Sequence, residues 1–153
     1  MNGIVALGAF VAGFTIAQIA KMMIVYLKSR GQATGREVLA WSFKSGGMPS
    51  GHAASFVALA TLLGLEQGVN SPIFALSVAM VIVIIYDATN VRYAVGEHGK
   101  ILNKLIDDYN CRNRHARTGK MKQIKLVEGH KLSEVVVGIW LGVVIGLSFY
   151  IIF

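Results

Sequence analysis

The sequence has 153 residues, enough for one domain, and 54% of them are hydrophobic while only 15% are charged. Soluble domains carry roughly 25% charged residues, so this composition excludes an ordinary soluble protein. The net charge of +7 is segregated into two stretches separated by long uncharged runs. We therefore expect an all-α, polytopic membrane helix bundle in which the whole chain, residues 1–153, forms a single domain.

Four uncharged runs divide the chain, and each is close to the roughly 20 residues that a helix needs to cross the hydrocarbon core. They are residues 3–20, 45–65, 67–86 and 135–153. The first run could be a signal peptide, but it lacks a basic start and an obvious cleavage site, so we expect a retained span. The sequence therefore predicts about four transmembrane helices.

The basic residues are distributed unevenly between these runs. The turn at residues 66–72 contains no Lys or Arg, whereas the segments after the first and third runs are rich in both. Because basic loops stay on the cytoplasmic side, we expect both basic loops inside the cell and both termini outside. The basic residues are Lys28, Arg30, Arg36 and Lys44 in the first segment, and Arg92, Lys100, Lys104, Arg112, Arg114, Arg117, Lys120, Lys122, Lys125 and Lys131 in the second.

The second basic segment also carries a helical pattern. Within residues 96–109, apolar side chains at 101, 102, 105 and 106 predict an amphipathic helix that lies on the membrane surface or over the site. Nucleic acid is another partner for a basic segment, but aromatic residues are few here. We therefore expect anionic lipid headgroups as partners, and no nucleic acid.

A regular glycine pattern marks the last apolar run. Gly138, Gly142 and Gly146 recur every four residues and so line one face of a helix. In membranes such small residues let helices approach closely, which favours a packing role over substrate contact. A bundle this small is also compatible with self-association.

The strongest local motif is Pro49-Ser50-Gly51-His52, at the start of the second run. Pro49 stops any preceding helix, and Ser50 is a good N-cap for the next one. The first N–H groups of that helix have no intrahelical partner and can bind an anion. His52 could donate a proton to the bound anion, although a capped helix with a histidine at headgroup level is an equally simple interpretation.

A second motif begins the fourth run. His130 and Glu134 are four residues apart and share one helix face. A carboxylate one turn away can fix the tautomer of an imidazole and leave its other nitrogen free to attack. The topology places this pair on the same side as Ser50 and His52, although an interfacial His–Glu pair without chemistry is the alternative.

Together the two motifs resemble those of the type 2 phosphatidic acid phosphatase superfamily, which also includes vanadium haloperoxidases. That family carries Pro-Ser-Gly-His in one motif and a His followed four residues later by Asp in another. A Gly-Gly-Met lead-in to Pro49 and the segments 87–92 and 96–103 point to the short, divergent bacterial and plant branch. The resemblance covers nearly the whole chain from Ala17 onward. It implies a phosphorylated lipid or isoprenoid as substrate and no cofactor or metal.

The resemblance also implies roles for individual residues. His130 would be the nucleophile that forms a phosphohistidine, and Glu134 would orient it. His52 would protonate the leaving oxygen. Ser50 and the Gly51 amide would hold phosphate oxygens, a form of electrostatic stabilisation that is often a large catalytic term. With the predicted topology, the active site is expected on the cytoplasmic side.

The chain departs from the family pattern in its cations. The Arg that the family places six residues before the nucleophile is Ile124 here, and the Lys-x6-Arg-Pro motif is missing. Phosphate charge still requires cations, so Arg92 is the first candidate, Lys21 the second and Lys44 a weaker third. Lys21 lies inside the first span, where a charge is expensive and usually functional, unless its side chain snorkels to the interface.

Three other functions remain as alternatives. A non-catalytic membrane protein could bind anionic lipids or isoprenoid phosphates in the same pocket, and a phosphohistidine on His130 would distinguish the two. A metal site built from His98, Asp107, Asp108 or His115 has no recognised ligand spacing. An intramembrane serine protease is disfavoured because its Ser and His would be only two residues apart.

Overall fold

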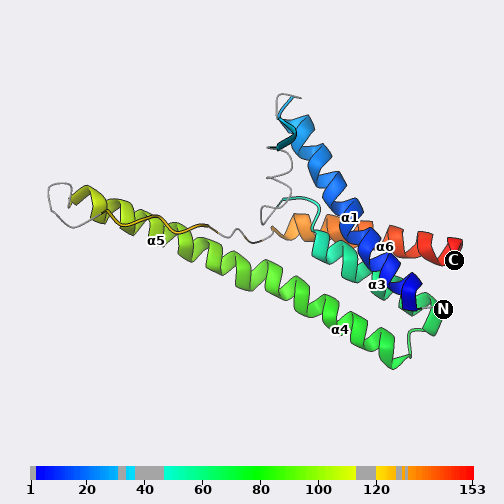
Figure 1. Ribbon diagram of the computed structural model, residues 1–153. Helices are drawn as coiled ribbons and strands as arrows, with labels where there is room; N and C mark the ends of the chain where they lie inside the picture. The colour runs from blue at the N-terminus through cyan, green and yellow to red at the C-terminus, as the bar shows by residue number, and fades with distance from the viewer. Residues whose placement is uncertain (1–2, 31–33, 37–46, 113–119, 127–128, 130) are drawn as a thin grey trace.

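The computed structural model describes residues 3–30, 34–36, 47–112, 120–126, 129 and 131–153. Its long helices confirm the predicted all-α membrane bundle (Figure 1). The helices are α1 (Gly3–Lys28), α3 (Gly51–Gln67), α4 (Pro72–Tyr86), α5 (Arg92–Arg112) and α6 (Leu132–Ile152), and a π-helical turn, η1 (Asp87–Val91), joins α4 to α5.

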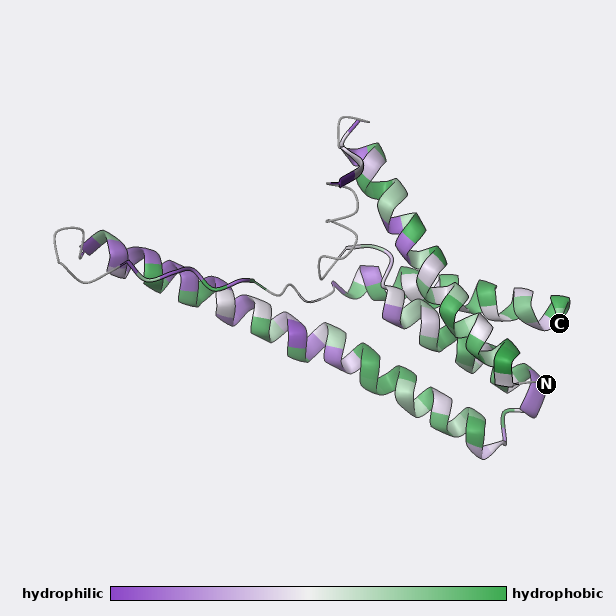
Figure 2. Cartoon of the chain, viewed as in Figure 1, coloured by the Kyte–Doolittle hydropathy of each residue, from purple (hydrophilic) through white to green (hydrophobic). Residues whose placement is uncertain are grey.

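Within the described residues, three helical stretches are long and apolar enough to cross a bilayer: α1, the continuous stretch Pro72–Arg112 and α6. The predicted second span, α3, has 17 residues. At 1.5 Å per residue it is about 26 Å long, at the short end of the range for a transmembrane helix. Figure 2 shows that apolar residues dominate α1, α4 and α6, whereas α5 is largely polar.

α3 is the central helix, with α1, α4 and α6 all packed against it (Figure 1). It begins as the Pro-Ser sequence predicts, because the Ala53 N–H donates to the Ser50 hydroxyl across 3.4 Å. Small buried residues such as Ala54 and Ala58 leave its surface narrow enough for neighbours on several sides. α3 is therefore the most enclosed of these helices.

The glycine pattern of α6 is a packing face against α3. A Cβ on Gly138 would lie 2.7 Å from the Ser50 carbonyl oxygen, and one on Gly142 would lie 2.6 Å from that of Ala54. The next repeat, Gly146, meets α3 one turn further along. Each glycine thus lets the two backbones approach closely enough for Cα–H···O contacts. The predicted packing role is confirmed.

The segment 96–109 is helical, as predicted, but it is not a separate helix. No Pro or Gly interrupts residues 86–92, so helical hydrogen bonding continues from α4 through η1 into α5. The result is one helix of 41 residues, and its α5 portion extends away from the bundle (Figure 1). The structure therefore places this segment beyond α4 rather than over the bundle.

Residues 120–126 run back alongside α5, opposite in direction to the helix (Figure 1). The Asn103 amide binds both backbone groups of Ile124, at 3.0 and 2.8 Å. The Asn110 amide binds those of Met121 in the same way, both at 2.9 Å. Asparagine side chains thus supply the hydrogen bonds that a second strand would otherwise give. We refer to α5 and residues 120–126 together as the arm.

The two chain ends lie together at one end of the bundle (Figure 1). At the opposite end α3 and α6 begin side by side, because the Ser50 N–H donates to the Glu134 carbonyl oxygen across 3.0 Å. Two helix N-termini therefore meet at one place, which is where the sequence predicted the site.

Candidate functional site

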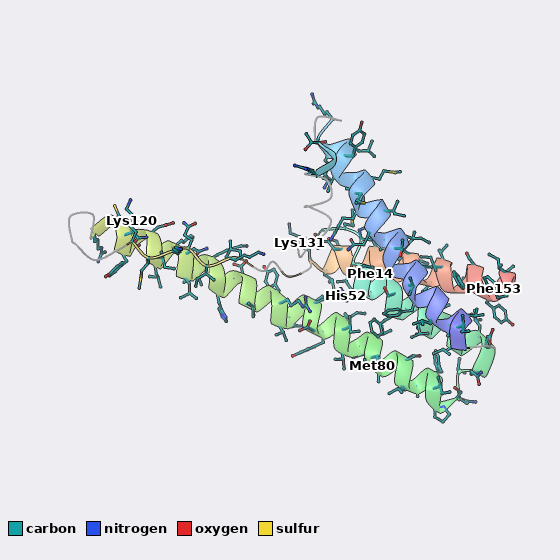
Figure 3. The ribbon with its side chains drawn as sticks, in the orientation of Figure 1. Phe14, His52, Met80, Lys120, Lys131 and Phe153 are labelled. Carbon is teal, nitrogen blue, oxygen red and sulfur yellow. The ribbon has the colours of Figure 1, made fainter. Side chains whose placement is uncertain are left out.

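The start of α3 forms one wall of the site. The Ser50 side chain is 1% exposed, held between its own helix and α6. A Cβ on Gly51 would lie 3.2 Å from the Phe14 ring of α1, so aromatic carbon covers one side of the Gly51 backbone. His52 is exposed and meets the same ring edge-on, with centroids 6.0 Å apart (Figure 3). Phe14 therefore helps to position the predicted acid.

Glu134 ties the two helix starts together. Its Oε2 accepts hydrogen bonds from the Gly47 N–H at 3.1 Å and from the Lys131 N–H at 3.2 Å. The second of these bonds caps the first turn of α6. In the same turn the Glu134 N–H donates to the Lys131 carbonyl oxygen at 2.9 Å. The carboxylate is thus fixed by backbone donors from two segments that are far apart in sequence.

Gly47 makes this arrangement possible. Its φ of +89° lies in the left-handed region, which favours glycine. A Cβ there would also lie 3.0 Å from Cε of Lys21. The chain two residues before the Pro-Ser-Gly-His motif therefore passes directly over the lysine of α1.

Lys21 points into the bundle rather than snorkelling outward. Only 6% of it is exposed, and its ammonium interacts electrostatically with Glu134. Burying a charge inside a membrane span costs free energy, so charged residues in such positions are usually paired with another polar group and have a function. The structure brings Lys21 to the same place as Ser50 and Glu134.

Arg92 lies at the end of η1 and pairs with Asp87, Nε to Oδ2, across 2.7 Å. Around an α-helix these residues, five apart, would be separated by about 140°. The π turn removes that separation, because its hydrogen bonds join residues i and i+5, as the Arg92 N–H to Asp87 carbonyl bond does here. The turn thus creates the ion pair.

The chain just before α6 rests on this turn. A Cβ on Gly129 would lie 2.7 Å from the Arg92 carbonyl carbon and closer still to the Tyr93 backbone. Only glycine fits there without displacing backbone. This contact brings the segment that leads to α6 against the first residues of α5.

Two of the predicted site residues, His130 and Lys44, lie outside the described residues. The described residues nearest to His130 in the chain are Gly129 and Lys131, and the Lys131 N–H donates to Oε2 of Glu134. The described residue that follows Lys44 in the chain is Gly47. For the alternative of a metal site, His115 lies outside the described residues, and within the described part of the chain no group of three His, Cys, Asp or Glu residues could hold an ion.

Residues 3–145 match the family described as the divergent PAP2 family. The chain belongs to that family. It is also 34% identical over 145 residues to YuiD, described as an uncharacterized membrane protein of Bacillus subtilis (strain 168), an alignment that covers 89% of this chain and 87% of the relative. No solved structure matches.

Family membership confirms the resemblance drawn from the two motifs and establishes the chain as a membrane protein of this divergent branch. The sequence motifs did not predict the role of Phe14. Gly47 and Gly129 stand at the start of the two motifs, but their close contacts were not predicted. The contacts of Phe14 and Gly129 come from segments distant in sequence.

Proposed function

We propose that the protein is a membrane phosphatase that hydrolyses a phosphomonoester or pyrophosphate of a lipid-like substrate through a phosphohistidine. The observation that carries this proposal is the hydrogen bond from Ser50 to Glu134, which joins the N-termini of α3 and α6 at one place. Helix N-termini attract anions, and the buried ammonium of Lys21 lies beside them.

The chemistry follows from these groups. A neutral His130 attacks phosphorus, the bond to the leaving oxygen breaks, and a protonated His52 supplies the proton that this oxygen needs. Water then attacks the phosphohistidine, giving inorganic phosphate and restoring the imidazole. Glu134 would hold His130, while Lys21, Lys44 and Arg92 would balance the phosphate charge.

A second function, binding of anionic lipid or isoprenoid phosphate without turnover, has its own support. Oε2 of Glu134 already accepts two backbone hydrogen bonds, a structural role that does not require catalysis. Ile124 also stands where the family usually has an Arg. A protein of this kind would keep the anion site and release no phosphate.

Phosphate release from a panel of lipid phosphates by the purified protein distinguishes these functions. His130→Ala should abolish both release and an acid-labile phosphoenzyme. His98→Ala is the matched control, because His98 is an exposed histidine on α5. Substrate binding without release in the wild type would favour the second function, and full activity in His130→Ala would exclude the mechanism.

The leaving group tests the role of His52. His52→Ala should slow release of a poor leaving alcohol much more than release of a nitrophenolate, which needs no proton. Equal damage to both substrates would make His52 a phosphate ligand instead.

We further propose that the site faces the cytoplasm, because the basic loops flank it. Cys111 is the chain's one cysteine and is exposed on α5. In intact cells a membrane-impermeant thiol reagent should therefore leave Cys111 unlabelled and should label a cysteine introduced at Gly68. The reverse pattern would overturn the orientation.

A further inference from the structure

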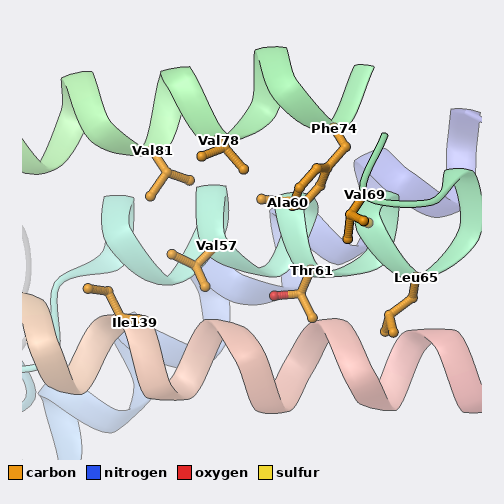
Figure 4. Close-up of a pocket in the computed structure, with 10 residues that line it drawn as sticks. Val57, Ala60, Thr61, Leu65, Val69, Phe74, Val78, Val81 and Ile139 are labelled. Carbon is orange, nitrogen blue, oxygen red and sulfur yellow. The ribbon is translucent and has the colours of Figure 1, made fainter. Parts of the chain in front are cut away.

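The described residues leave apolar surface exposed in two different settings. One is on the membrane-spanning helices, and it includes a groove of about 450 Å³ along α3 between α4 and α6 (Figure 4). Bilayer lipid is as apolar as this surface and can cover it. The other setting is the arm, where α5 carries exposed apolar side chains on a largely polar helix (Figure 2).

The arm extends beyond the hydrocarbon core of the membrane. The helical stretch Pro72–Arg112 has 41 residues, so it is about 62 Å long, about twice the thickness of the core. α4 carries no charged residue, whereas α5 carries charged residues along its whole length. The part that crosses the core is therefore α4 with η1, and α5 continues into the headgroup region and the water beyond it. Lipid chains do not cover it there.

The exposed apolar side chains of α5 form a stripe, which consists of Val95, Leu102, Leu105 and Tyr109. Each of the four is between 41% and 59% exposed. Their spacings of seven, three and four residues place them on one side of the helix, as in the seam of a coiled coil. His98 occupies one position of the same seam, and a single polar residue there is a feature that fixes the register of coiled coils.

The membrane sets how two copies of this stripe meet. Two copies in one bilayer have parallel arms, and the same residue of each copy stands at the same height above the membrane. A two-fold axis along the membrane normal then places Leu102 opposite Leu102 and Leu105 opposite Leu105. This is the arrangement of a parallel, in-register coiled coil, in which each position of the seam meets its own equivalent.

The charges beside the stripe favour the same pairing. Asp108 borders the stripe on one side, and Asn103 and Asn110 border it on the other. These asparagines hold residues 120–126, a segment with three lysines and no acidic residue. In a parallel pair each border of one helix faces the opposite border of the other. Asp108 of one copy therefore faces the basic segment of the second copy.

We propose that two copies of the protein pair through their arms, stripe against stripe, within one membrane. The stripe spans about two heptads, which would be marginal between free peptides. Here α4 continues directly into α5 and presents a preformed helix, and a shared bilayer raises the effective concentration of the arms. The proposal does not depend on the chemistry of the candidate site.

Disulfide formation between single cysteines tests the pairing in the full-length protein in phosphatidylcholine vesicles. In a Cys111→Ser background, Leu105→Cys should give a cross-linked dimer on mild oxidation, because equivalent seam positions face each other. Leu102→Cys repeats the test in case Leu105→Cys does not fold. Lys104→Cys is the matched control: its side chain points about 100° away from Leu105, so it should cross-link about tenfold less. Equal cross-linking at 104 and 105 would indicate random collisions and overturn the proposal.

Energy transfer between copies gives a second measurement without an introduced cysteine. Cys111 is exposed on α5 and can carry a donor in one population and an acceptor in another. Transfer in vesicles should exceed that of random mixing in the wild type, should fall to the random level in Leu105→Lys, and should persist in Lys104→Ala. The melting temperature of Leu105→Lys should match that of the wild type, because α5 lies outside the bundle. Wild-type transfer at the random level would mean that the arm lies on the bilayer surface or binds another protein, and would overturn the proposal. Transfer that Leu105→Lys leaves intact would overturn it too.

Discussion

The bundle of α1, α3 and α6 and the arm are built by different means. In the bundle, glycines and alanines let backbones touch, and the polar groups of Lys21 and Ser50 are buried. In the arm, α5 holds residues 120–126 mainly through exposed side-chain amides. The candidate site residues Lys21 and Ser50 therefore lie where closely packed backbones fix their polar atoms. We expect substitutions in the arm to be better tolerated than substitutions in the bundle.

Among the substitutions that test this comparison, we expect the largest loss of stability at Gly142. Gly142→Ala would push a Cβ against the Ala54 carbonyl oxygen, 2.6 Å away, and should cost about 1–3 kcal/mol of stability through overpacking. Thermal unfolding in detergent measures it. Gly3→Ala is the control, since nothing lies within 4 Å of that position. Equal melting temperatures for the two variants would contradict the packing role.

Substitutions of Glu134 should cause the next largest loss of stability. Glu134→Gln keeps a carbonyl oxygen that can accept from Gly47 and Lys131, whereas Glu134→Asp is one methylene too short. Loss of this cap should cost about 1 kcal/mol in Glu134→Asp, and less in Glu134→Gln. Denaturant unfolding of the two variants tests the order, and an Asp variant as stable as wild type would show that the cap is dispensable.

The ion pair at η1 should affect ligand binding more than stability. Exposed ion pairs contribute at most about 1 kcal/mol, so Asp87→Asn should leave the melting temperature nearly unchanged. If Arg92 binds phosphate, loss of the carboxylate that holds its Nε should weaken vanadate binding roughly fivefold.

Glu97→Gln is the matched control for that variant. Glu97 pairs with Lys100 at the same 2.7 Å and with similar exposure, on the same helix. Vanadate titration of both variants decides the point: similar affinities would remove Arg92 from the list of phosphate ligands.

The smallest effect is expected in the arm. Asn103→Ala removes both hydrogen bonds to Ile124, which should raise the exchange rate of the Ile124 amide without changing bundle stability. Hydrogen exchange read by mass spectrometry reports it, with Lys104→Ala as the neighbouring control. A global loss of protection would show that arm and bundle fold as one unit.

Local signals were enough for several features. Ser50 caps α3 because capping depends on neighbouring residues, and the α6 glycines pack because their period alone defines a face. The burial of Lys21 could not be predicted, since it depends on Gly47 crossing from another segment. The sequence did not predict the π turn at residues 87–91, and an α-helix there would hold Asp87 and Arg92 apart.

Two distances in the arm are equal, one along α5 and one along the extended segment beside it. Seven helical residues from Asn103 to Asn110 rise about 10 Å, and three extended residues from Met121 to Ile124 also span about 10 Å. The spacing of the two asparagines along α5 therefore matches the spacing of the two residues that they bind in the extended segment. Inserting one residue between Met121 and Ile124 would shift one clamp by about 3 Å relative to the other and break the match. Relatives that keep both asparagines should accordingly keep both spacings, while length changes beyond Arg112 need not disturb the match.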